Sequence, residues 1–203
     1  MIVDAVVFGM IDVAELRRLH RVARFDFWIA AAAIVGVLSA GVLLGVVVGV
    51  VLSLVWLVYV ATRPGMPLLG REPGTQVFRD LAENPDDETI PGVAVIRLDG
   101  GLFFATAEAV SDRIRSVVED DPDLRLVVLD LEGADFIDSQ GSAVLGEMWD
   151  ELADGNVDLQ LARLKPHVRE LLTADGVLER LGSDRVHATI NGAIDAGLGA
   201  AGS

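Results

Sequence analysis

The chain has 203 residues, of which 52% are hydrophobic, and its mean hydropathy of +0.47 is too high for one ordinary soluble domain. It has no cysteine, which excludes disulfides, thiolate metal sites and cysteine nucleophiles. Charge is unevenly distributed, because residues 1–72 carry a net +1 and residues 73–203 carry a net −16. An acidic domain repels phosphate backbones, so we expect no nucleic acid partner.

The first two predicted segments lie beside or in a membrane. Residues 1–13 are apolar but contain Asp4 and Asp12, and they are too short to span a bilayer, which takes about 20 residues. They lack the basic start and the cleavage site of a signal peptide, so we interpret them as the end of a truncated transmembrane helix that begins outside this sequence. Residues 14–26 contain arginines three to four positions apart between leucines, which predicts a basic cytoplasmic segment at the lipid interface.

A long uncharged run follows, from Phe27 to Thr62. As one helix it would extend about 54 Å, against about 30 Å for the hydrocarbon core, so residues 27–62 predict a transmembrane hairpin. Arginines before and after the run place both of its ends in the cytoplasm. The run has no acid, lysine, arginine or histidine, and therefore offers no intramembrane group for ion binding or proton relay.

Four glycines punctuate this run, at Gly36, Gly41, Gly45 and Gly49. The last three are four residues apart, a spacing that lets two helices approach closely. Alternatively, Ser39–Gly45 is simply the turn between the two helices. We favour the turn, since glycines are common in membrane helices of every kind.

Residues 63–74 contain three prolines and three glycines, which predicts an extended linker. Residues 75–198 then alternate between strand and helix patterns, which predicts one compact α/β domain, and residues 199–203 form a tail. The predicted strands are 75–81, 93–98, 102–104, 126–130, 157–164 and 185–188. The predicted helices are 107–119, 142–152, 166–174 and a final one that starts after Thr189, with Leu198 on its inner face; 178–182 is expected to be a turn.

The candidate functional loop follows the buried strand 126–130. Its residues are Asp138, Ser139, Gln140, Gly141 and Ser142. Hydroxyl groups at a helix start tolerate a phosphate electrostatically, but aspartate and serine are also the preferred capping residues. We favour the interpretation that Asp138 or Ser139 only caps the helix and that Gly141 allows close packing.

The same loop contains four acids, Asp130, Glu132, Asp135 and Asp138. Carboxylates in a cluster are magnesium ligands, yet a solvated acidic turn is the commoner outcome, and we favour it. The three histidines are dispersed, and no G-x-S-x-G elbow occurs. We therefore expect no metal site, no cofactor and no enzyme activity.

Two adjacent aromatic residues, Phe103 and Phe104, follow the Asp99–Gly101 turn. They are expected to divide between the core and the surface. An exposed phenylalanine there would dock a partner, but we favour the core.

The chain resembles the end of a SulP-family anion transporter, and the resemblance covers nearly its whole length. It is carried by the order and spacing of five segments: ELRRLHRVARFDF, LLGREPGTQVFRDL, VIRLDGGLFFATA, LVVLDLEGADFIDSQGSAVL and LARLKPHVRELLTADGVLERLG. The resemblance implies the last transmembrane helices of the transporter followed by a cytoplasmic STAS domain, a mixed sheet with helices packed mainly on one face. Bacterial anti-sigma-factor antagonists share that fold.

Family resemblance also implies the function: secondary transport of sulfate, bicarbonate or dicarboxylates, with the STAS domain as a regulatory or assembly module. The anion site of the family lies on upstream helices, so no substrate-binding residue carries over, and the chain is not transport-competent alone. Many relatives have proline where Leu44 stands. We expect a bacterial plasma membrane location, with the remaining membrane part of the transporter or a second protomer as partner, and a cytoplasmic protein on the STAS domain.

One family feature is missing. Relatives that act as phosphorylation switches carry the sequence Asp-Ser-Ser/Thr-Gly and accept phosphate on the second hydroxyl residue. The corresponding residues are Asp138, Ser139, Gln140 and Gly141, and an amide cannot be phosphorylated at Gln140. The alternative function is a membrane-tethered STAS interaction module of the anti-sigma-factor-antagonist type.

Overall fold

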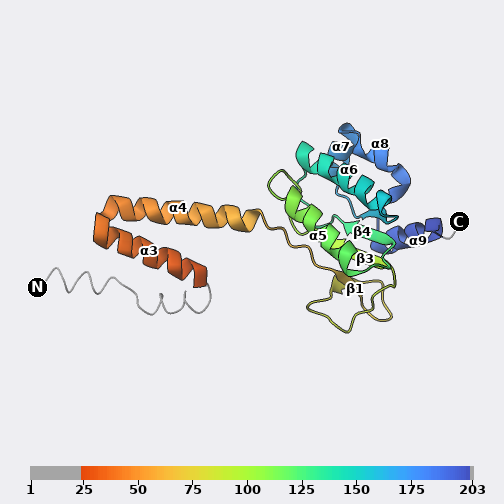
Figure 1. The fold of residues 1–203 in the computed structure, drawn as a ribbon, viewed down its shortest axis with the longest axis horizontal. Helices are drawn as coiled ribbons and strands as arrows, with labels where there is room; N and C mark the ends of the chain where they lie inside the picture. Colours follow the sequence, from red (N-terminus) through yellow and green to blue (C-terminus); the bar gives the residue numbers. More distant parts are fainter. Residues whose placement is uncertain (1–23, 202–203) are drawn as a thin grey trace, which may run out of the picture. The chain divides into compact units, whose positions relative to one another are not determined.

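The computed structural model describes residues 24–201 (Figure 1). The interpretations of residues 1–13 as the end of a transmembrane helix and of 14–26 as an interfacial segment fall outside the described residues, except for the last three positions. The internal contacts of the chain divide it into two units, one up to Val60 and one from Ala61 onward.

The described residues of the first unit form two helices, α3 (Arg24–Ala40) and α4 (Val42–Ala61), separated by Gly41. Gly41 has φ +90°, a backbone conformation that glycine adopts without strain. By length and composition α4 is able to cross a membrane, whereas the apolar part of α3, Phe27–Ser39, is shorter. The predicted hairpin of two helices is therefore present, with its turn at a single glycine.

Glycines of α4 face α3. A Cβ atom added to Gly45 would lie 2.6 Å from the backbone nitrogen of Val37, and one added to Gly49 would lie 3.4 Å from the Cβ of Ala33. The absence of side chains at these two positions lets the helices approach closely. The expectation that Ser39–Gly45 is only a turn is thus wrong for Gly45, which belongs to α4 and packs against α3.

The second unit is built on a four-stranded sheet in the order β3-β4-β5-β6, with all neighbours parallel. The strands are β3 (Val93–Arg97), β4 (Leu126–Asp130), β5 (Asp158–Ala162) and β6 (Val186–His187). Antiparallel bridges join Leu68 to Ile96 and Gly65 to Asp99 along the outer edge of β3. The sheet is therefore mixed, as expected, and β6, within the predicted strand 185–188, lies at its other edge.

A short antiparallel pair precedes this sheet, formed by β1 (Leu69–Arg71) and β2 (Phe78–Asp80). Behind it, the buried carboxylate of Asp87 accepts a hydrogen bond from Arg79 Nε at 2.9 Å. This hydrogen bond is the main reason why the pKa of Asp87 lies below its usual value. Because β1, the bridges from Gly65 and Leu68 and the buried Met66 all fall within residues 63–74, most of that proline-rich stretch packs with the domain.

Helices cover both faces of the sheet. Successive strand residues point to opposite faces, so Val127 and Leu129 contribute to one core while Leu126 and Val128 contribute to the other. The helices over the first core are α5 (Ala107–Asp120), α6 (Ser139–Asp154), α7 (Pro166–Ala174) and α8 (Val177–Leu181), and α9 (Ile190–Ala201) covers the second. Helices thus pack mainly on one face, as the fold class predicted.

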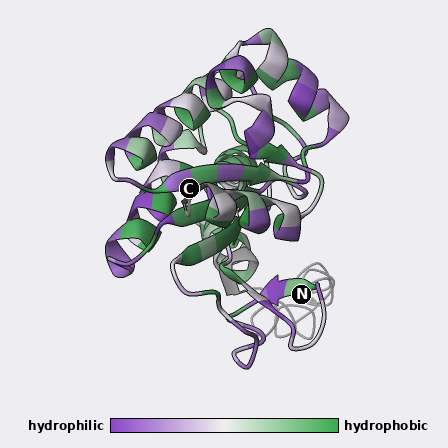
Figure 2. Ribbon diagram, turned by 90° about the vertical axis from the view of Figure 1, so that its right-hand side faces the viewer, coloured by the Kyte–Doolittle hydropathy of each residue, from purple (hydrophilic) through white to green (hydrophobic). Residues whose placement is uncertain are grey.

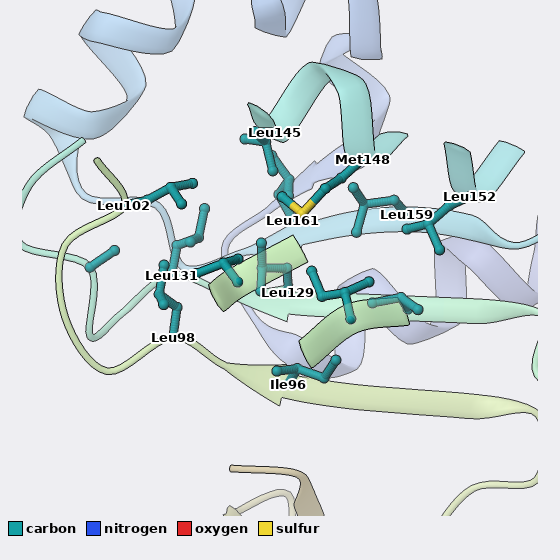
Figure 3. Packing of buried hydrophobic residues seen from close by; sticks show 14 of the residues in the cluster. Ile96, Leu98, Leu102, Leu129, Leu131, Leu145, Met148, Leu152, Leu159 and Leu161 are labelled. Atoms are coloured by element: carbon teal, nitrogen blue, oxygen red, sulfur yellow. The ribbon is translucent and has the colours of Figure 1, made fainter. Parts of the chain in front are cut away.

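The larger core is almost entirely aliphatic. Leu129 of β4 and Leu159 and Leu161 of β5 point toward Leu145 and Met148 of α6 (Figure 3). In the central strands β3 and β4 every residue except the last is hydrophobic, whereas the surrounding helices alternate between hydrophobic and hydrophilic residues (Figure 2). This pattern is the one expected for a parallel sheet buried on both faces.

Three local predictions were wrong. Residues 102–104 are not a strand, since Leu102 forms a single bridge, with Ile137, and the next residues turn into α5. Residues 178–182 are mostly helical, as part of α8. Leu198 is 42% exposed, because Gly197 and not Leu198 faces the sheet, where a Cβ would meet the side chain of Leu126.

Candidate functional site: the loop before helix α6

The candidate loop connects β4 to α6 and lies against the loop that follows β3. Three backbone hydrogen bonds join the two loops. Gly100 N–H donates to Gly133 O at 3.2 Å, Leu102 N–H to Phe136 O at 2.9 Å, and Asp138 N–H to Leu102 O at 3.2 Å. The two loops therefore form one continuous surface at the carboxyl end of the parallel strands, where α/β folds commonly place their sites.

Asp138 is the N-cap of α6. Its Oδ1 accepts a hydrogen bond from Gly141 N–H at 2.7 Å, and its Oδ2 accepts one from Phe104 N–H at 3.2 Å. A carboxylate at this position pairs with the unsatisfied amides of the first turn and with the positive end of the helix dipole. Asp138 thus caps α6, as the sequence suggested. Its second hydrogen bond, from Phe104 N–H, also holds the neighbouring loop.

Two glycines allow the close approach of these loops. A Cβ at Gly141 would overlap the carbonyl oxygen of Leu102 and lie 2.6 Å from its carbonyl carbon, and a Cβ at Gly133 would lie 2.5 Å from Leu98 O. Neither neighbour can yield easily, since both are backbone atoms. Gly141 therefore serves packing, as we favoured from the sequence.

The hydroxyl and amide residues of the loop differ in access to solvent. Ser139 and Gln140, in the first turn of α6, are exposed. Ser142 is completely buried, and its Oγ is the only buried side-chain oxygen or nitrogen without a hydrogen-bond partner among residues 24–201. Of the two serines, only Ser139 is accessible to an enzyme that modifies hydroxyl groups.

The solvated acidic turn that we expected is present only in part, because Glu132 and Asp135 are exposed whereas Asp130 is not. Asp130 is fully buried at the end of β4, where Arg163 Nε donates to its Oδ1 at 2.8 Å and a second guanidinium nitrogen pairs with its Oδ2. The same guanidinium contacts Glu132. Arg163, whose backbone has φ +57°, thereby ties the candidate loop to β5. A buried carboxylate needs such a partner because desolvation penalises its charge.

Asp135 is exposed but also paired. It accepts a hydrogen bond from the Lys165 ammonium group, and this bond lowers the pKa of Asp135. The backbone oxygen of Asp135 lies 2.8 Å from His167 Nε2. With Asp138 engaged as a cap, every acid of the loop has a partner, and no cluster of metal-ligating side chains occurs in the described part of the chain.

Sequence reasoning missed Arg163, which lies 33 residues from Asp130. The available signal was a polar residue directly after each of two buried strands, since neighbouring parallel strands bring their carboxyl ends together. It also missed the role of Thr106. This residue directly precedes α5, but its hydroxyl group donates to Gly101 O at 2.8 Å and accepts from Phe103 N–H at 3.0 Å instead of capping the helix.

Aromatic rings lie on the outer surface of the paired loops. Phe104 is 74% exposed and Phe136 is 54% exposed, and the half-buried ring of Phe103 lies between them, with centroids 5.7 Å and 6.2 Å away. We call these three rings the aromatic patch. The preference for the core was wrong for Phe104, because residues 102–104 form a loop and the alternation of a strand does not apply.

The sequence matches the family model of the STAS domain over residues 84–193, and the chain belongs to that family. It is homologous along nearly its whole length to the carboxy-terminal region of SulP/SLC26 sulfate transporters. It is 33% identical over 188 residues to a probable sulfate transporter of Mycobacterium tuberculosis, an alignment that covers 92% of this chain and 34% of that protein. It is also 32% identical over 203 residues to sulfate transporter 2.1 of Arabidopsis thaliana, and that alignment covers 94% of this chain and 30% of that protein.

The fold is also that of a solved anion transporter. This chain superposes on the structure of murine Slc26a9 in its inward-facing state with a TM-score of 0.78 and 19% sequence identity. The superposition covers 94% of this chain and 31% of the Slc26a9 chain. This chain spans about a third of the length of the curated relatives that it matches. The relatives from Mycobacterium tuberculosis and Arabidopsis thaliana are both named as sulfate transporters, the former as a probable one.

Proposed function

We propose that this chain is the carboxy-terminal portion of a SulP-type secondary anion transporter. Helices α3 and α4 are its closing membrane helices, and the STAS domain is a regulatory or assembly module on the cytoplasmic side of a bacterial plasma membrane. One observation carries the proposal: relatives named sulfate transporters align with 92–94% of the chain, including both the hairpin and the STAS domain.

The transported anions belong to the sulfate, bicarbonate or dicarboxylate class. The chain does not transport alone, because the run from Phe27 to Thr62 has no acid, lysine, arginine or histidine and the chain corresponds to about a third of its relatives. Its first partner is therefore the remaining membrane part of the transporter or a second protomer, and its second is the lipid bilayer.

Regulation proceeds through binding and not through phosphate on residue 140. Gln140 has no hydroxyl group, and the surrounding loop is fixed by the cap at Asp138 and by the close approach at Gly141. A rigid, partly aromatic surface is suited to docking a cytoplasmic protein.

The test is anion uptake. Cells deleted for the gene are supplied with this chain, with the membrane-spanning region encoded upstream, or with both, and uptake of labelled sulfate, bicarbonate and succinate is measured. The proposal expects uptake only when both parts are present. An upstream frame is expected to encode roughly ten to twelve apolar spans.

Uptake that is unchanged when this chain is removed would overturn the proposal. In that case the chain is a membrane-tethered STAS interaction module. A control that supplies the hairpin without residues 75–203 separates a need for the two helices from a need for the STAS domain.

A further inference from the structure

The exposed apolar surface of the STAS domain is concentrated at one place. Between residues 62 and 201 the exposed large hydrophobic side chains are Val77, Phe104, Phe136 and Leu198. Two of the four belong to the aromatic patch, where Phe103 connects them. Exposed aromatic rings that cluster in a soluble domain mark interaction surfaces more often than isolated exposed side chains do.

The backbone beneath the patch is rigid. Phe104 N–H is held by Asp138 Oδ2 and Phe103 N–H by Thr106 Oγ1, while Phe136 O accepts from Leu102 N–H. Both loops are thus ordered before any partner arrives. A preorganised aromatic surface loses little conformational entropy on binding.

The surroundings of the patch are acidic. Segments 97–108 and 130–142, which form the two loops and the helix starts beside them, contain one arginine and six acids. Arg163 and Lys165 pair with three of these acids, which leaves a net charge of −3. Glu108, in the first turn of α5, is exposed and has no ion-pair partner among the described residues.

We propose that the aromatic patch docks a cytoplasmic polypeptide segment in which apolar side chains alternate with lysine or arginine. The apolar side chains contact Phe103, Phe104 and Phe136, and the cationic groups lie against the acidic rim. Charge complementarity selects this partner, because an acidic peptide or an anionic lipid surface would be repelled by the rim and by the net −16 of residues 73–203.

This inference deepens the proposed function, since it rests on the STAS domain being an interaction module and names the chemistry of its partner. The full chain is reconstituted in phosphatidylcholine nanodiscs, and binding of a fluorescent twelve-residue peptide of leucine and lysine is measured by anisotropy, with empty nanodiscs as the blank. One comparison peptide has serine in place of leucine at equal charge, and another has glutamate in place of lysine.

The variant F104S/F136S is compared with V77S. Val77 directly precedes β2 and is exposed, so V77S removes an exposed apolar side chain and leaves the aromatic patch intact. The proposal expects the leucine–lysine peptide to bind the wild type and V77S equally, and F104S/F136S about tenfold more weakly. Binding is expected to weaken as salt is raised. Thermal unfolding of both variants checks that the domain is folded.

Three results would overturn the proposal. The first is equal binding of the leucine–lysine peptide by F104S/F136S and V77S, and the second is binding of the serine–lysine peptide to the wild type as tight as that of the leucine–lysine peptide. The third is evidence that the aromatic patch joins two copies of this chain. The last is detected by analytical ultracentrifugation, as a wild-type dimer that F104S/F136S dissociates. None of these readouts uses transport, so a failure here leaves the uptake experiment to decide the proposed function independently.

Discussion

The carboxylate of Asp138 accepts a hydrogen bond from the backbone amide of Phe104 at 3.2 Å, across 34 positions of the sequence. With its other oxygen the same carboxylate caps α6, through Gly141 N–H at 2.7 Å. One side chain therefore sets both the start of a helix and the position of the neighbouring loop.

Replacing Asp138 tests this double role. We expect D138A to lower the free energy of unfolding by about 1–2 kcal/mol, because a cap and a second amide partner are lost. D138N, which retains a good capping side chain, should lose less. Urea unfolding followed by Trp149 fluorescence, with Trp28 and Trp56 replaced by phenylalanine, reports on the STAS domain. A D138A variant as stable as the parent would contradict the prediction.

Gly141 is the second test of the loop. An added methyl group would overlap Leu102 O, so G141A should destabilise the STAS domain by about 2–3 kcal/mol, as overpacking against backbone does. The matched control is G199A in α9, where nothing lies within 4 Å of the added atom and alanine should stabilise the helix by a few tenths to about 1 kcal/mol. Opposite signs for the two variants in urea unfolding would confirm the close approach.

Arg163 should be more important to stability than a surface arginine. R163A leaves the fully buried carboxylate of Asp130 without its partner, and we expect a loss of about 3 kcal/mol. Adding D130N to R163A removes the uncompensated charge and should restore part of that loss. A double-mutant cycle by urea unfolding measures the coupling. Additive effects of the two changes would show that the pair is not coupled.

The pH dependence of stability tests Asp87. Its pKa is lowered by Arg79, so its contribution is fully present above the ordinary carboxyl pKa of about 3.9 and is lost as the pH falls through the lower folded-state value. We expect the wild type to have a higher thermal midpoint than D87N at pH 7, with the difference narrowing below pH 4. E83Q, at an exposed carboxylate, is the control, and its thermal midpoint at pH 7 should lie close to that of the wild type.

Because the chain has no cysteine, an introduced pair of cysteines can test the packing of α3 against α4. A Cβ at Gly49 would lie 3.4 Å from the Cβ of Ala33, close to the 3.5–4.5 Å usual in disulfides. We expect A33C/G49C to oxidise to an intramolecular disulfide in membranes, seen as a mobility shift that reductant reverses. V35C/G49C, with one cysteine about 200° further round α3, should stay reduced. A disulfide in both variants would contradict the packing of α3 on α4.

Much of this fold was predictable from local pattern. The buried strand 126–130, the helix from Pro166 and the caps at Asp138 and Thr189 each follow from adjacent residues. The predictions that were wrong depend on distant partners. Phe104 is exposed because residues 102–104 form a loop, whose position Asp138 fixes through the Phe104 amide, and Gly45 packs because Val37 lies opposite. No periodicity within a single segment contains that information.

Helix α9 also has a consequence for biosynthesis. It is the only helix among the described residues over the face of the sheet that contains Leu126 and Val128, where Leu69 of β1 and Phe78 of β2 also pack, and it follows strands β1 to β6 in the chain. While the ribosome is still translating, the sheet can form with its opposite face covered, yet the part of this face beneath α9 stays open until residues 190–201 have left the exit tunnel. We therefore expect nascent chains stalled before Ile190 to be the species that chaperones hold and proteases clear.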